Sequence, residues 1–62
     1  MWIKYKYKGN LCFLNLEHAE AVTLVTNDRK QCIVVEINGS IYKIEDSENE
    51  NFEEIKQKLM EL

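Results

Sequence analysis

Apolar and polar residues alternate along most of the first 45 positions of the chain, and the spacing changes after Ser47. Alternation places successive side chains on opposite faces of a strand, whereas apolar residues every three or four positions line one face of a helix. The pattern predicts an α+β fold in which consecutive hairpins form a curved antiparallel sheet of four to five strands, packed against one C-terminal amphipathic helix. We expect strands at about 2–8, 11–16, 21–26, 31–37 and 40–45, and the helix at about 48–61.

The pair Asn38-Gly39 is the strongest turn signal in the chain. A two-residue type I′ turn needs positive φ at both central positions, which Asn followed by Gly adopts at little cost. This turn places Ile37 opposite Ser40 and Val35 opposite Tyr42. One face of the hairpin is then apolar on both strands, and we expect it to be the core side: Ile33, Val35, Ile37, Tyr42 and Ile44.

A second two-residue turn is predicted at Gly9-Asn10. It would pair Tyr7 with Cys12, and the same register brings together an apolar face made of Ile3, Tyr5, Tyr7, Cys12, Leu14 and Leu16. Polar and exposed apolar side chains would occupy the opposite face of this hairpin.

The third hairpin is predicted from the β-rich run at 21–26, closed by a four-residue loop at 27–30. This loop would set Leu24 opposite Ile33 and Val22 opposite Val35, and so continue the core face. The link 17–20 fits a bend, a bulge or a helical turn equally well.

The helix is predicted from apolar residues that recur at three- and four-residue steps, namely Phe52, Ile55, Leu59 and Leu62. Ser47 with Glu50 fits a capping box, and Asn49 or Asn51 are alternative caps. Acidic residues early in the helix and lysines late in it suit the helix dipole. We expect the helix to cross the concave face of the sheet.

With 62 residues, the chain has room for one domain spanning 1–62 and for a thin core, which leaves no space for a deep cofactor cleft. No apolar run approaches the roughly 20 residues that span a bilayer, and the first residues lack the apolar core of a signal peptide. We therefore expect a cytoplasmic protein without a membrane partner. In that compartment Cys12 and Cys32 are expected as free thiols, although their pairing is left open.

The net charge of −3 conceals an asymmetry between the two halves of the chain. Residues 1–31 carry five basic and three acidic groups, or +2, and residues 32–62 carry three basic and eight acidic groups, or −5. The molecule should therefore be electrically polar, with each end favouring a different partner.

No catalytic or metal-binding pattern is recognisable. His18 is the single histidine, and no nucleophile or acid lies near it at a familiar spacing. A metal site made from Cys12, His18 and Cys32 would lack any closely spaced ligand pair. Both glycines belong to predicted turns and not to a phosphate-binding loop. We expect no enzyme activity, no cofactor and no metal.

Two candidate binding surfaces remain. The first, which we call the basic stripe, is the outer face of the first hairpin, where lysines alternate with exposed apolar groups: Trp2, Lys4, Lys6, Lys8, Leu11 and Phe13. Rings and aliphatic groups among lysines suit a partner-binding patch. Lysines that protect an edge strand from aggregation would explain the same pattern equally well.

The second surface, which we call the outer apolar face, belongs to the later strands: Thr23, Val25, Cys32, Val34 and Ile41. An antiparallel sheet with one solvated face normally carries polar residues there, so these side chains predict a covering element. The sheet itself, a second copy of the chain or a different protein are the alternatives.

The segment Gly9-Asn10-Leu11-Cys12-Phe13-Leu14-Asn15-Leu16, followed later by Ile37-Asn38-Gly39, resembles small bacterial regulatory proteins of the flagellar FlbD type. The resemblance covers two hairpin segments and implies no functional residue.

These features favour a non-enzymatic protein-interaction module: a small regulator or inhibitor, of the economical kind that phages encode, that binds a larger protein or forms a homodimer. One alternative is a protein that binds single-stranded nucleic acid through Lys4, Lys6, Lys8, Trp2 and Phe13. The overall acidity opposes it. Another alternative is an acidic mimic of a nucleic acid, built from Glu45, Asp46, Glu48, Glu50, Glu53 and Glu54.

Overall fold

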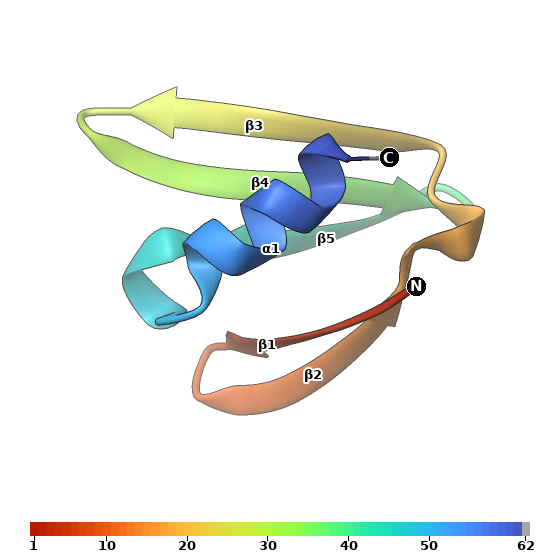
Figure 1. Ribbon diagram of the computed structural model, residues 1–62, viewed down its shortest axis with the longest axis horizontal. Helices are drawn as coiled ribbons and strands as arrows, with labels where there is room; N and C mark the ends of the chain where they lie inside the picture. Colours follow the sequence, from red (N-terminus) through yellow and green to blue (C-terminus); the bar gives the residue numbers. More distant parts are fainter. Residues whose placement is uncertain (62) are drawn as a thin grey trace.

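The computed structural model describes residues 1–61 as an α+β fold with five strands and one C-terminal α-helix (Figure 1). Short 3₁₀ turns, η1 at Leu16–His18 and η2 at Asp46–Glu48, follow the second and the fifth strand. The remaining elements are β1 (Trp2–Tyr7), β2 (Asn10–Asn15), β3 (Ala21–Asn27), β4 (Lys30–Ile37), β5 (Ser40–Glu45) and α1 (Phe52–Met60).

The strands form two antiparallel sheets, so the expectation of one continuous curved sheet is wrong. β1 pairs with β2 in one sheet, and the other has the order β3-β4-β5. The chain breaks the ladder at η1, where the Asn15 side chain accepts a hydrogen bond from the Glu17 backbone N–H at 3.0 Å and the Leu16 side chain enters the core. The link at 17–20 therefore begins as a helical turn and does not pair β2 with β3.

The first hairpin turns at Lys8-Gly9, one residue earlier than predicted. Tyr5 therefore pairs with Cys12, and the register differs by two residues from the one expected from Gly9-Asn10. Lys8 and Gly9 have φ values of 51° and 80°, the same as Asn38 and Gly39 in the later turn. Glycine at the second turn position thus decides the register, and a shift of two residues leaves every side chain on its predicted face.

The other two hairpins have the predicted registers. Ile37 pairs with Ser40 and Val35 with Tyr42, as expected from Asn38-Gly39. Leu24 pairs with Ile33 and Val22 with Val35, as expected for the 21–26 strand. The loop between these strands is shorter than predicted, because Asn27 and Lys30 belong to the ladder and only Asp28-Arg29 form the turn.

The helix begins at Phe52, four residues after the predicted start. Asp46–Glu48 form η2, and neither Glu45 nor Asn51 makes a side-chain cap hydrogen bond. The two asparagines before the helix bond instead to β1: the Asn49 side chain to the backbone of Lys6, and the Asn51 side chain to the carbonyl of Lys4.

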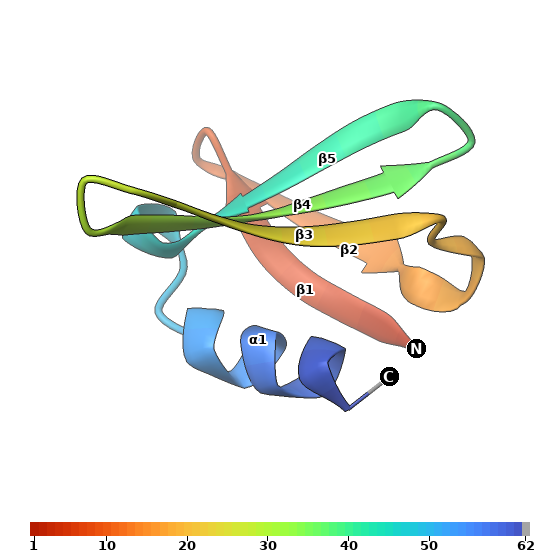
Figure 2. The ribbon, with the colours of Figure 1, turned by 90° about the horizontal axis from the view of Figure 1, so that it is seen from above.

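The core lies where both sheets face α1, which forms a separate layer beside the strands (Figure 2). Apolar side chains from α1, η1 and every strand except β3 enter it: Ile3, Tyr5, Leu14, Leu16, Ile33, Val35, Ile44, Phe52 and Ile55. Val22 and Leu24 have the predicted register but stay largely exposed, so the core does not continue across β3 as expected. Within the described residues, no helix has the length and hydrophobicity needed to cross a membrane.

Candidate protein-binding surfaces

The reactive side chains of the described residues are scattered. His18 lies exposed on η1, and Cys12 and Cys32 are free, partly buried thiols on different sheets. Among residues 1–61, His, Cys, Asp and Glu side chains form no group of three or more that could hold a metal ion. The arrangement therefore directs attention to surfaces.

Two partly or fully buried groups have shifted pKa values. Burial, and next the nearby Cys12 and Tyr42, raise the pKa of the Tyr5 hydroxyl. Burial, and next the negative charge of Glu45, raise the pKa of the Cys32 thiol. A thiol with a raised pKa is mostly protonated at neutral pH, so Cys32 is a weak nucleophile.

Five of the six residues of the basic stripe lie on the outer face of β1 and β2 as predicted, and the sixth, Lys8, lies in the turn between them. Lys4 lies directly opposite Phe13, and Lys6 directly opposite Leu11. Trp2 and Phe13 are 66% and 62% exposed, which is unusual for large aromatic side chains. Lys8 belongs to the turn, where its ammonium lies 5.4 Å from the centre of the Tyr7 ring.

Acidic residues lie closer to the basic stripe than the sequence suggests. A groove of about 860 Å³ runs between β1 and the segment that leads into α1. Its lining combines stripe residues with acidic ones: Trp2, Lys4, Lys6 and Leu11 from the hairpin, and Asp46, Glu48, Glu50 and Glu54 from the later segment. One Glu48 carboxylate oxygen is buried without a hydrogen-bond partner in the described structure. The groove is therefore mixed in charge.

Two acidic side chains of α1 are partly neutralised by lysines of the same helix. Lys56 Nζ lies 3.7 Å from the Glu53 carboxylate, and Lys58 Nζ lies 3.4 Å from the Glu54 carboxylate. Exposed pairs of this kind contribute only a few tenths of a kcal/mol to stability. They nevertheless reduce the continuous negative surface that a nucleic-acid mimic would need.

The outer apolar face is also assembled as predicted. Val34 of the central strand β4 lies opposite Thr23 on one side and Lys43 on the other, and Val25 lies opposite Cys32. Ile41, at 61% exposure, marks the far end of this face on β5. Val34 and Cys32 are half-buried and the rest are exposed, so the sheet does not cover its own outer face.

The open edge of β3 is the feature that was not predicted from the sequence. All seven residues of β3 are exposed, and β3 is the terminal strand of the three-stranded sheet (Figure 1). The turn Asp28-Arg29 makes Asn27 and Lys30 a hydrogen-bonded pair, and such pairs recur at every second position of an antiparallel ladder. The backbone N–H and C=O groups of Val22, Leu24 and Thr26 therefore point away from the sheet.

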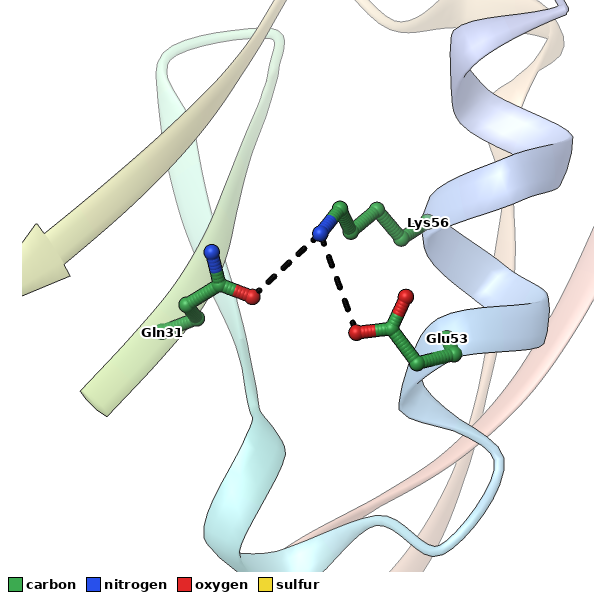
Figure 3. A network of polar contacts seen from close by, with 3 residues as sticks. All are labelled: Gln31, Glu53 and Lys56. Atoms are coloured by element: carbon green, nitrogen blue, oxygen red, sulfur yellow. Dashed lines mark hydrogen bonds and ion pairs between the residues drawn. The ribbon is translucent and has the colours of Figure 1, made fainter. Parts of the chain in front are cut away.

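An apolar notch adjoins this open edge. It has a volume of about 200 Å³ and is lined by Val22, Leu24, Ile33, Lys56, Leu59 and Met60. Lys56 spans from α1 to β4, where its Nζ lies 3.4 Å from the Gln31 side-chain oxygen and also near Glu53 (Figure 3). This contact ties the helix to β4 and leaves β3 uncovered beside it.

The sequence does contain a signal for this edge. Ala21–Asn27 carries no charged residue, a property that it shares with β2, whereas β1, β4 and β5 each carry at least one lysine. Edge strands normally carry charges or prolines that discourage pairing with other chains. An uncharged strand is usually central, and here it is at the edge.

Comparisons with protein-family models, with curated proteins and with solved structures find no match for this chain. The local resemblance to proteins of the FlbD type is therefore not supported at the level of a family, and the surfaces alone bear on function.

Proposed function

We propose that this chain is a non-enzymatic protein-interaction module, a small cytoplasmic regulator or inhibitor that works by binding another protein chain. The observation that carries the proposal is the exposure of large apolar side chains on three regions: the basic stripe, the outer apolar face and β3. Among the described residues, seven large apolar side chains are exposed in these regions, against nine in the core: Trp2, Leu11, Phe13, Val22, Leu24, Val25 and Ile41.

The physical argument concerns the cost of leaving such groups in water. Each Å² of apolar surface removed from water contributes about 25 cal/mol, and large contiguous apolar patches are rare on monomeric proteins unless they bind something. Val25, Val34 and Ile41 lie in neighbouring strands, and the open edge of β3 borders them. A partner that covers this region would gain apolar contacts and backbone hydrogen bonds together.

Affinity capture from a lysate of the source organism, followed by mass spectrometry, tests the proposal. Wild type is compared with Val34→Glu on the outer apolar face, with Phe13→Glu on the basic stripe and with Leu24→Lys on β3. We expect a protein retained by wild type to be lost from at least one variant whose circular dichroism is unchanged. Retention of the same proteins by all four chains would contradict the proposal.

A second candidate function, the binding of single-stranded nucleic acid, has one observation in its favour. Lysine and exposed aromatic side chains alternate across the β1-β2 hairpin, with Lys4 opposite Phe13 and Trp2 at the end of the row. Lysines attract phosphates and aromatic rings stack on bases. The acidic residues of the neighbouring groove oppose this function.

A titration of Trp2 fluorescence with single-stranded oligonucleotides at low salt distinguishes the two candidates. Nucleic-acid binding predicts quenching that weakens steeply as salt is raised, and that is lost in Phe13→Ala. An unchanged fluorescence signal at the lowest salt concentration would exclude this second candidate.

A further inference from the structure

We infer that the partner of β3 is β3 of a second copy of this chain, paired antiparallel so that two three-stranded sheets become one six-stranded sheet. This inference rests on the proposed function, since it identifies the chain that one of the proposed surfaces binds. Four features of the open edge support it.

The first feature is the backbone. An antiparallel pair related by a two-fold axis at Leu24 would place Leu24 opposite its own copy and Val22 opposite Thr26 of the other chain. Those three residues are the ones whose N–H and C=O groups face outwards, so every outward group along the strand finds a partner. A two-fold interface of this kind uses the same surface on both copies.

The second feature is charge. β3 has no charged side chain that would repel its copy. At its ends, the turn holds Asp28 with Arg29 and Lys30, a net charge of +1, and the opposite end begins after Glu17 and Glu20. Antiparallel pairing brings the positive turn of one copy beside the acidic end of the other. Parallel pairing would bring like ends together.

The third feature is the apolar notch. Val22 and Leu24 lie on the same side of β3 as Leu59 and Met60 of the helix, and Met60 is 71% exposed. With the two-fold axis at Leu24, the notches of both copies meet across the new strand pair. The dimer would therefore bury a continuous apolar surface as well as the two backbone edges.

The fourth feature is that the free edges of β1 and β5 are less open than that of β3. The outward groups of β1 are occupied in part by the Asn49 and Asn51 side chains. On β5, Asn49 also donates to the Glu45 carbonyl at 2.9 Å, and Lys43 and Glu45 place charges along the strand. β3 and the uncharged strand β2 both lack these devices, and of the two strands β3 is the one that adjoins the apolar notch.

Sedimentation velocity of the purified chain tests the inference over a concentration range from a few micromolar to about 1 mM, because a short-strand interface is small. We expect wild type to reach twice the monomer mass. Leu24→Lys and Leu24→Glu should each remain monomeric, because each places like charges opposite one another at the two-fold axis. An equimolar mixture of the two should regain the dimer mass. Ser40→Lys, which adds the same charge at an exposed position beside the β4-β5 turn and outside the proposed binding surfaces, should behave as wild type.

Circular dichroism establishes that each variant is folded. Failure of the mixture to associate would overturn the two-fold arrangement, and a wild type that stays monomeric at 1 mM would overturn the dimer itself. The proposed function can be tested independently of the dimer. A monomeric chain that retains a lysate protein, and loses it in Leu24→Lys, contradicts the dimer and keeps the interaction module; a monomeric chain with no protein lost from any variant contradicts both.

Discussion

β1 and β3 are both edge strands of similar length, yet the molecule treats their free edges differently. On β1, the Asn49 side chain accepts from the Lys6 N–H at 2.7 Å and donates to the Lys6 carbonyl at 3.1 Å, so it pairs with Lys6 as a neighbouring strand would. Asn51 donates to the Lys4 carbonyl at 3.0 Å. On β3, no described side chain or loop makes such a bond with Val22, Leu24 or Thr26.

β1 combines two features that block pairing at its edge, and β3 has neither. Lys4 and Lys6 place charge along β1, and the asparagines in addition occupy its backbone groups. Asn49 is the single buried polar residue among those described, at 5% exposure, and it also donates to the Glu45 carbonyl. Because it bonds to β1 and to the end of β5, it joins the two sheets that the ladders leave separate.

Among the variants that test this comparison of β1 with β3, proline substitutions on β3 should change the free energy of unfolding the most. Val25 and Leu24 are almost equally exposed, at 42% and 45%, but the Val25 N–H bonds to β4 and the Leu24 N–H points outwards. We expect Val25→Pro to lower the free energy of unfolding by about 3 kcal/mol, through the lost ladder bond and the clash of the ring. Leu24→Pro should lower the free energy of unfolding by only about 1 kcal/mol, because the N–H that it removes makes no hydrogen bond in the monomer.

Urea denaturation followed by circular dichroism measures both variants. Chain concentrations at which wild type is monomeric keep any association out of the comparison. Equal destabilisation by the two prolines would mean that the Leu24 N–H is not at a free edge.

The next effect concerns Asn49. Asn49→Ala removes three hydrogen bonds and leaves the backbone of Lys6 without its partners, so we expect a loss of about 2 kcal/mol in the free energy of unfolding. Asn51→Ala, which removes one exposed bond, is the matched control and should cost about 0.5 kcal/mol. Urea denaturation again gives the free energies of unfolding. Similar losses of stability in both variants would mean that Asn49 does not hold the two sheets together.

The strand pairings that could be predicted from sequence were those fixed by local turn chemistry and alternation. Asn38-Gly39 and the core faces of β1, β2 and β4 follow from which residues tolerate positive φ and which are apolar. Tyr42 of β5 and Val22 and Leu24 of β3 were also predicted for the core side, and they are exposed. The register of the first hairpin did not follow, because Lys8 adopts a φ of 51° that lysine seldom takes, and Asn10 is the better candidate by residue type.

The late start of the helix and the division into two sheets depend on contacts between distant residues. Asn49 reaches Lys6 and Asn51 reaches Lys4, 43 and 47 positions away, and no local pattern encodes such a contact. The candidate surfaces divide in the same way. The basic stripe and the outer apolar face are products of alternation, whereas the open edge depends on which strand lies outermost and on what fails to cover it.

The smallest expected effect is a pH-dependent contribution to stability that comes from β1 and not from β3. β1 carries Tyr5, whose pKa is raised by burial, whereas β3 has no titratable side chain. The pKa of Tyr5 is higher in the folded state than in the unfolded state, where it is about 10. The contribution of Tyr5 to the free energy of unfolding is therefore fully present below the unfolded pKa, and it is lost as the pH rises through the folded pKa. Urea denaturation at pH 8 and at pH 10.5 should therefore show a smaller fall in the midpoint urea concentration for Tyr5→Phe than for wild type, since the substitution removes no other titratable group. An equal fall in the two chains would mean that Tyr5 ionises in the folded protein as readily as in water, and that β1 contributes no pH-dependent stability to the fold through this residue.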